Sequence, residues 1–340
     1  GVALALMETL ADFGVASYFG IQTFTAGIYK AWLAMDNAAA AAQLATMLLF
    51  TVGLLLWVER RSQQRLRFAS LRGQRAGSQE AQPVRLRGGA AGLVLVLCVL
   101  PVLFGFVLPV VFMLRPLIGG WDELPWGMFV QWSRNSLWLA GLTAVLATSV
   151  ALALGFALRT QPSPATRAVV QLTGLGYAVP GAVIVVGLLM PVSWVQGRWP
   201  ESGVGYWLTA TLLGVLWAYL VRFIAVALQS IQSGYARIPV SADETARMLG
   251  SSGRDVFARV HWPLLRPAAA SALLLVWVDV MKELPATLVL RPFNTDTLAV
   301  MAYQLARDER LGEAALPSLA LVIAGLLPVL LMARAQNPTK

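Results

Sequence analysis

The chain has little of the chemistry that most enzymes use. It has 340 residues, with one cysteine, one histidine and a charged share of only 13%. Cys98 lies inside an apolar run, so neither a disulfide framework nor a thiol metal site is expected. His261 is the single histidine, which excludes His-rich metal clusters and most His-based catalysis. No lysine follows a glycine, so a Walker-type phosphate loop is absent from the sequence.

Hydrophobic residues are abundant instead, at 58% of the chain, and the mean hydropathy is +0.68. They form runs of about 18 residues or more, long enough to cross a bilayer as helix. We therefore expect an all-α, polytopic membrane protein with about eight transmembrane helices. The expected spans are residues 1–20, 38–58, 90–114, 136–158, 169–190, 206–226, 268–290 and 315–333.

The distribution of basic residues predicts the orientation. With segment 59–89 on the cytoplasmic side, the loops of that side hold 17 Lys and Arg residues and the opposite loops hold 7. This bias predicts a cytoplasmic C-terminus and a cytoplasmic 241–263 loop. Segment 59–89 is rich in Arg, Gln, Ser and Gly, which is typical of a flexible linker that contacts anionic lipid head groups. Without a folded module or interleaved aromatics, we expect no nucleic-acid binding.

Two features within the expected spans are typical of transporter helices. Pro180-Gly181 is expected to interrupt a span in mid-membrane, because proline removes a backbone hydrogen bond. Small residues recur at three- and four-residue spacing and permit close helix approach. They are Gly141, Ala144, Ala147, Ala151 and Gly155.

The chain also resembles itself at an offset of about 271 residues. The match rests on the rare acids, because this offset aligns Glu8 with Asp279 and Asp12 with Glu283. Acids within spans are rare and costly, so chance coincidence is disfavoured. At this offset, the counterpart of Glu244 falls about 27 residues upstream of Gly1. We therefore expect an N-terminally truncated piece of a two-repeat protein.

A polar stretch between two apolar runs reads E-T-A-x-x-x-G-x9-V-x-W-P from Glu244 to Pro263. It resembles the E-A-A-x-x-x-G-x9-I-x-L-P loop of ABC-importer permeases. Thr245 and Trp262 depart from that pattern. In this family the loop forms a short cytoplasmic helix that docks into an ATPase subunit. We expect Ser241 to cap this helix and Gly250 to end it.

The resemblance implies a type I importer fold that lacks an ATPase site of its own and binds no cofactor. It also implies two copies of a cytoplasmic ABC ATPase, which bind ATP and Mg, and an external substrate-binding protein. The residues expected to shape the ATPase-coupling loop 241–263 are Asp243, Glu244, Ala246, Arg247, Gly250 and Pro263.

The N-terminal segment Met7-Glu-Thr-Leu-Ala-Asp-Phe-Gly14 is similar to the ferric-iron permeases. These are double-length, multi-pass proteins of the cell inner membrane with two fused repeats, so the resemblance implies that localisation. The resemblance implies that residues 1–58 are the end of a first repeat, 59–89 the linker, and 90–336 a complete second repeat. It implies ferric iron as the substrate, delivered by a periplasmic binding protein. Thiamine or another small solute is the alternative, because related permeases carry these.

Glu8, Asp12, Asp279 and Glu283 are the candidate translocation-pathway residues. Oxygen ligands suit a hard trivalent cation, but no firm metal site is assigned. Lys282 lies beside Glu283 and one helical turn from Asp279, so structural charge pairing is the competing interpretation. An ion-coupled secondary transporter would also use such acids, yet it leaves the 241–263 loop unexplained. A membrane enzyme would need a convergent set of His, Cys or acidic groups near one interface. This sequence has one His and one Cys, and its candidate acids lie within the expected spans, which disfavours an enzyme.

Overall fold

The computed structural model describes residues 2–73 and 87–336, and within these two ranges all regular structure is helical. The helices are α1 Val2–Ala11, α2 Gly14–Tyr18, α3 Phe24–Tyr29, α4 Ala38–Gly73, α5 Gly89–Val102, α6 Leu108–Gly119, α7 Trp126–Thr160, α8 Pro164–Thr173, α9 Gly181–Arg198, α10 Val204–Thr209, α11 Leu212–Tyr235, α12 Val240–Met248, α13 Gly253–Val256, α14 Trp262–Met281, α15 Pro285–Leu290, α16 Leu298–Arg307 and α17 Leu311–Gln336. The all-α prediction is confirmed.

The described residues contain seven helices that are long and apolar enough to cross a membrane. These candidate spans are Ala38–Glu59, Gly89–Gly119, Trp126–Thr160, Gly181–Arg198, Leu212–Tyr235, Gly253–Met281 and Leu311–Pro328. The π-helical turns at 103–107 and 257–261 continue into their neighbouring helices, so they interrupt neither span. Seven of the eight expected spans therefore have a counterpart, with shifted boundaries.

The expected span over residues 1–20 is wrong. The structure divides it into α1 and α2, and ten residues of helix reach only about 15 Å. The chain breaks after α1, where the Thr25 hydroxyl donates a hydrogen bond to the Asp12 carbonyl at 2.6 Å.

Two other expected spans are broken as well. The 169–190 region ends one helix at Thr173 and starts α9 at Gly181, directly after Pro180, so the expected interruption at Pro180-Gly181 is confirmed. The 268–290 region ends α14 at Met281 and restarts at Pro285. Proline suits the first turn of a helix because its missing N–H would be unpaired there anyway.

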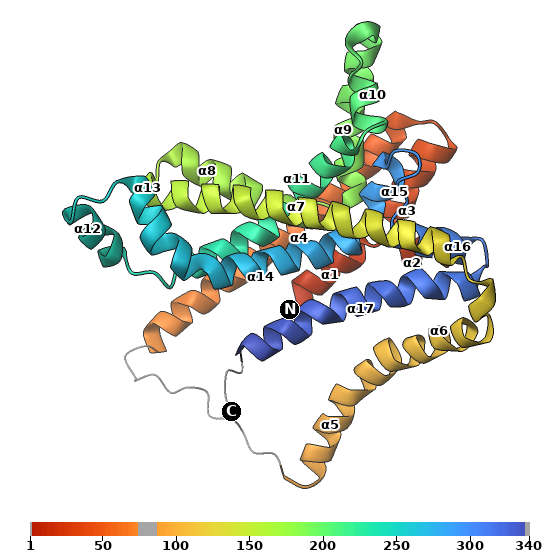
Figure 1. Cartoon of the computed structure of the whole chain (residues 1–340), viewed down its shortest axis with the longest axis horizontal. Helices are drawn as coiled ribbons and strands as arrows, with labels where there is room; N and C mark the ends of the chain where they lie inside the picture. The colour runs from red at the N-terminus through yellow and green to blue at the C-terminus, as the bar shows by residue number, and fades with distance from the viewer. Residues whose placement is uncertain (1, 74–86, 337–340) are drawn as a thin grey trace.

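The central bundle consists of α7, α11 and α14, which pack against one another (Figure 1). Small residues on α7 make this possible: Ala147 and Ala151 are fully buried. A Cβ atom on Gly155 would lie 2.9 Å from the Ile231 side chain. Close backbone approach of this kind is how helices associate in lipid. Gly141 is the exception among the expected small residues, because no atom lies within 4 Å of its Cβ position.

A second apolar cluster joins the N-terminal helices to α9. Its buried members include Ile28 of α3, Leu48 and Val52 of α4, and Val186 of α9. In contrast, the α5–α6 segment is exposed on nearly all sides and packs mainly through α6 on α17. A helix that is apolar all round and uncovered is typical of a lipid-facing span.

The order α1–α2–α3–α4 recurs as α14–α15–α16–α17. In both copies, a threonine in an extended conformation caps the third helix. The Thr23 hydroxyl accepts the Ala26 N–H at 3.2 Å, and the Thr297 hydroxyl accepts the Val300 N–H at 3.4 Å. This recurrence is the arrangement that an internal repeat requires. The two copies touch where α2 packs against α16, and the Ser17 and Tyr303 hydroxyls lie 2.8 Å apart there.

Candidate functional site: the α12 loop and an acid-lined cavity

Helix α12 lies at one end of the bundle, far from α15 and α16 (Figure 1). Its C-terminus is a Schellman motif, in which the Gly250 N–H donates to the Arg247 carbonyl and the Ser251 N–H donates to the Ala246 carbonyl. Gly250 has φ +84°, a left-handed conformation that is costly for residues with a Cβ. The prediction that Gly250 ends the helix is confirmed.

The predicted N-cap is wrong. Helix α12 begins at Val240, one residue before Ser241, and Pro239 occupies the N-cap position without a side-chain cap. Proline at this position holds the extended backbone, φ −64° and ψ 145°, from which the helix starts. Pro263 stands in the first turn of α14, as expected for the return into the membrane.

Asp243 points into the protein rather than toward a partner. Its Oδ2 accepts a hydrogen bond from Arg159 Nε at 2.7 Å, and its Oδ1 lies 2.9 Å from His261 Nε2. The same arginine also donates to the carbonyls of Ile238 and Pro239, at 3.0 and 3.1 Å. Asp243 and His261 are buried. We call Asp243, Arg159 and His261 the α12 anchor.

Asp243 is ionised at neutral pH. Burial alone raises the pKa of Asp243, but the hydrogen bonds from Arg159 and His261 outweigh it and hold the pKa below its ordinary value. Arg159 belongs to the last turn of α7, and His261 directly precedes α14. The anchor therefore joins α12 to two helices of the central bundle.

The opposite face of α12 is uncovered. Glu244 and Arg247 are exposed, Met248 is 90% exposed and Leu249 is 81% exposed. Ala246 is half-buried between the two faces. The helix thus offers a mixed charged and apolar surface, while its inner face is bonded to the membrane helices.

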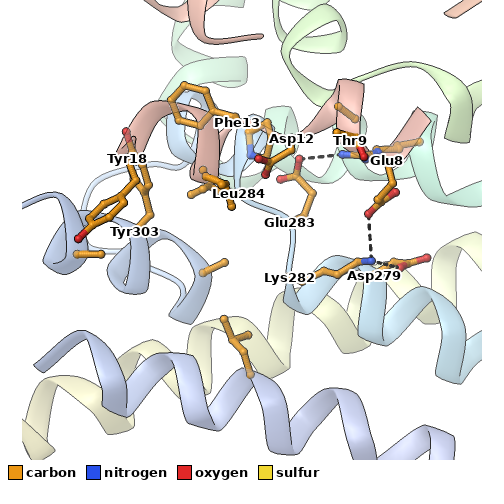
Figure 2. A pocket seen from close by; sticks show the side chains of 18 of the residues that line it. Glu8, Thr9, Asp12, Phe13, Tyr18, Asp279, Lys282, Glu283, Leu284 and Tyr303 are labelled. Carbon is orange, nitrogen blue, oxygen red and sulfur yellow. Dashed lines mark hydrogen bonds and ion pairs between the residues drawn. The ribbon is translucent and has the colours of Figure 1, made fainter. Parts of the chain in front are cut away.

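A cavity of about 670 Å³ brings together the four predicted pathway acids. Glu8 and Asp12 come from the end of α1, and Asp279 and Glu283 from the end of α14 (Figure 2). The two chain segments are about 271 residues apart in sequence, so only the fold makes them neighbours. Tyr18, Tyr177 and Tyr303 complete much of the polar lining.

Lys282 lies between two of these acids. Its Nζ is 3.4 Å from Glu8 Oε1 and 3.2 Å from Asp279 Oδ1 (Figure 2). The side chains of Lys282 and Glu8 are about half exposed, so the pair is accessible from the cavity. Lys282 therefore forms the ion pair with Asp279 that the sequence suggested, and it also pairs with Glu8.

Glu283 is part of the internal structure. It is 4% exposed, and its carboxylate accepts the N–H groups of Ala286 and Thr287 at 3.0 and 3.1 Å. It therefore caps α15, where the helix dipole favours negative charge. Arg222 Nη1 lies 3.4 Å from its Oε1. A Cβ on Gly181 would lie 2.8 Å from the same oxygen, so glycine makes room for this carboxylate.

Asp12 differs from its sequence counterpart Glu283. Within the described ranges its half-buried carboxylate has no ion pair, although its backbone carbonyl is bonded by Thr25. Four acids and two bases, Arg222 and Lys282, line the cavity, which leaves it with an excess of carboxylates. In the described part of the chain, no three His, Cys, Asp or Glu side chains converge as a metal site.

Comparison with known proteins identifies the family. The model of the family "Binding-protein-dependent transport system inner membrane component" matches residues 149–338. This is more than half of the chain, so the protein belongs to this family of ABC-importer permeases.

Individual relatives differ in what their names say they carry. An Fe(3+)-transport system permease of Haemophilus influenzae is 25% identical over 97% of this chain and 64% of its own length. The chain thus spans less than two thirds of that relative. A putative 2-aminoethylphosphonate transport system permease of Salmonella choleraesuis is 28% identical, covering 74% of this chain and 97% of the relative.

A solved structure supports the fold. The bacterial alginate ABC transporter, in complex with an alginate pentasaccharide-bound periplasmic protein, matches at a TM-score of 0.57 and 14% identity. The match covers 73% of this chain and 95% of that chain.

Proposed function

We propose that this chain is the membrane-spanning subunit of an ATP-driven importer and that α12 couples it to a cytoplasmic ABC ATPase. The proposal rests on the observation that one face of α12 is bonded to the helix bundle while the opposite face is exposed. Its inner face is ion-paired to Arg159 of α7 and hydrogen-bonded to His261 at the start of α14. Its outer face presents Glu244, Arg247, Met248 and Leu249. An amphipathic helix with an uncovered face of this kind fits a groove on a partner protein.

The anchor gives the coupling a mechanical path. When two ATPase copies close on ATP and Mg²⁺, the docked α12 moves with them. Because Arg159 and His261 hold Asp243 from two different helices, α7 and α14 follow that movement together. Rigid-body rocking of packed helices alternately opens the cavity to either side of the membrane. The chain itself supplies no ATP site in this proposal.

We further propose ferric iron as the substrate, delivered by a periplasmic binding protein. The identity to the Haemophilus Fe(3+) permease over nearly the whole chain supports this. The acid-lined cavity also supports it, because carboxylate oxygens suit a hard cation. Arg222 and Lys282 already engage three of the four acids, so contact with the ion is transient rather than storage.

The topology and the domain boundaries belong to the same proposal. Residues 1–58 are the end of a first permease repeat and 90–336 a second one, joined by the linker 59–89. Helix α17 runs from the end near α16 back toward the end where α12 lies, which supports a C-terminus on the ATPase side (Figure 1). That side is the cytoplasm, in agreement with the excess of Lys and Arg in its loops.

The test uses the intact permease and its ATPase, reconstituted in lipid nanodiscs. ATP hydrolysis is measured with ferric-, thiamine- and 2-aminoethylphosphonate-loaded binding proteins. We expect stimulation by the ferric protein alone, and we expect Glu244→Lys to abolish it. Glu201→Lys reverses a charge on another exposed acid, far from α12 in sequence, and should keep the stimulation.

Each other outcome has a distinct meaning. Stimulation by another loaded protein retains the importer and rejects iron. If no ATPase associates, and collapse of ion gradients stops uptake, the protein is a secondary transporter and the proposal fails.

A further inference from the structure

Two loops at the end of the molecule opposite α12 hold exposed aromatic side chains outward. In the α15–α16 loop, residues 291–297, Phe293 is 98% exposed. In the α2–α3 turn, residues 19–23, Phe19 is 69% exposed and Ile21 is 55% exposed. These two loops occupy equivalent places in the recurring element order, and α2, α3, α15 and α16 lie together in Figure 1.

The α15–α16 loop is held in one conformation. Asn135 of α7 donates to the Asp296 carbonyl at 3.0 Å, and Ser136 of α7 accepts the Leu298 N–H at 2.8 Å. Within the loop, Arg291 and Asp296 form an ion pair. Asn294 has φ +60°, a left-handed turn that presents the neighbouring Phe293 to the outside.

The α2–α3 turn is held in a comparable way. The Ile21 N–H donates to the Ala16 carbonyl at 2.8 Å, and Gly20 adopts φ +68°. The Ser17 hydroxyl lies 2.8 Å from the Tyr303 hydroxyl, which ties α2 to α16. Each loop is therefore fixed by its own hydrogen bonds, so little conformational entropy is lost when a partner binds them.

The position of these loops favours a partner in the aqueous phase. Asn135 and Arg159 are separated by about 36 Å along α7, more than the roughly 30 Å hydrocarbon core of a bilayer. The loops and the α12 anchor thus lie on opposite sides of the membrane. Irregular backbone does not occur facing lipid within the hydrocarbon core, which disfavours Phe293 as a lipid contact.

We propose that the α2–α3 turn and the α15–α16 loop together dock the water-soluble, substrate-loaded binding protein, with Phe293 and Phe19 as the anchors. This rests on the importer function proposed above. Rigid aromatic side chains carry much of the energy in protein interfaces. Phe19 and Tyr18 also line the acid-lined cavity, so a protein docked here delivers its cargo at the border of that cavity.

The test measures the affinity of fluorescently labelled, loaded binding proteins (ferric, thiamine and 2-aminoethylphosphonate) for the reconstituted permease–ATPase complex. We expect Phe293→Asp and Phe19→Asp each to weaken the binding protein that wild type binds by about tenfold or more. Phe293→Leu keeps an apolar side chain and should stay within about threefold. Because Phe293 is almost wholly exposed, its replacement leaves the fold intact.

A photo-crosslinker separates protein contact from lipid contact. p-Benzoylphenylalanine at position 293 should form an adduct with the added binding protein, identified by its mass. The same group at Phe104, 60% exposed in the middle of the lipid-facing α5–α6 segment, should form lipid adducts only. Lipid adducts alone at 293, or unchanged affinity in both aspartate variants, overturn the docking surface and leave the importer function standing. If wild type binds none of the three proteins, the proposed function fails and the docking surface fails with it.

Discussion

Asp243 and Glu244 show how neighbouring acids in one short helix acquire opposite roles. Successive residues of an α-helix point about 100° apart, so one side chain can face the bundle while the next faces solvent. Asp243 is 6% exposed and bonded to Arg159 and His261, whereas Glu244 is exposed. The first holds α12 in place, and the second is free for a partner.

Removing the Asp243 charge should destabilise the protein. Asp243→Asn leaves the Arg159 guanidinium without its carboxylate in a site that is only 16% exposed, so we expect a loss of about 2 kcal/mol at neutral pH. Thermal unfolding followed by tryptophan fluorescence measures the corresponding fall in Tm. Glu244→Gln, one residue away on the exposed face, should leave the Tm unchanged. Equal Tm values for both variants would show that the anchor contributes nothing.

The same variant has a defined pH dependence. The folded-state pKa of Asp243 lies below its unfolded value of about 3.9, so its contribution to stability is complete above about pH 5. That contribution is lost as the pH falls through the folded pKa. The Tm difference between wild type and Asp243→Asn should therefore shrink below pH 4. A difference that stays constant down to pH 3 would contradict the ion pair.

The sequence could predict some of these residues because their signals are local. Gly250 follows a polar helical stretch, and acids within spans are rare enough to single out Glu8, Asp12, Asp279 and Glu283. The partners Arg159 and His261 were missed, because they lie 84 and 18 residues from Asp243 and only the fold brings them together. The lone histidine next to the membrane-entry proline was the one available signal.

At the scale of elements, helix breaks inside apolar runs were the hardest feature to predict. Hydropathy measures how apolar a segment is, but it does not show where a helix ends within that segment. At the α1–α2 break the Thr25 hydroxyl donates to the Asp12 carbonyl, and at the α14–α15 break Glu283 accepts the free N–H groups of Ala286 and Thr287. These partners lie outside the helix that ends, so the hydropathy of the segment does not reveal them. The break at Pro180-Gly181 was predicted because its proline and glycine are a local signal, and Pro285 marks the restart after α14 in the same way.

Gly176 makes the break before α9 possible. A Cβ on Gly176 would lie 2.0 Å from the Val221 carbonyl oxygen of α11, which is backbone and cannot rotate away. Gly176→Ala should therefore cost about 2 kcal/mol or more through overpacking, measured as a lower Tm in detergent. Gly187→Ala, on α9 with no atom within 4 Å of the new Cβ, should be neutral or stabilise by up to about 1 kcal/mol.

The two glycine variants provide their own control, since they make the same chemical change 11 residues apart. If Gly187→Ala lowers the Tm as much as Gly176→Ala does, then glycine flexibility in this region matters more than close packing. If neither lowers it, the η4 turn, Gly176–Ala178, is not seated on α11 as the structure has it.

At the scale of the whole molecule, the acid-lined cavity depends on an interface between distant parts of the chain. One wall comes from α1 and α2, and the other from α14–α16. The apolar cluster of α3, α4 and α9 joins these parts, with Ala41, Leu48 and Ile28 almost wholly buried. The ion pair between Glu8 and Lys282 also joins the N-terminal helices to α14, but both side chains are about half exposed. Apolar packing therefore contributes most of the free energy that holds these parts together.

This division predicts that the N-terminal helices associate without a covalent link. Residues 1–73 and 87–340, produced together as two tagged polypeptides, should co-purify in detergent. Ala41→Trp forces a large ring into a position that is 0% exposed and should weaken the association, since overpacking costs about 1–3 kcal/mol. Phe50→Trp places the same ring on the face of α4 that is 73% exposed, and it should co-purify like wild type. If Ala41→Trp also co-purifies fully and the unbroken chain keeps its Tm, then the α3–α4–α9 cluster does not hold the cavity together.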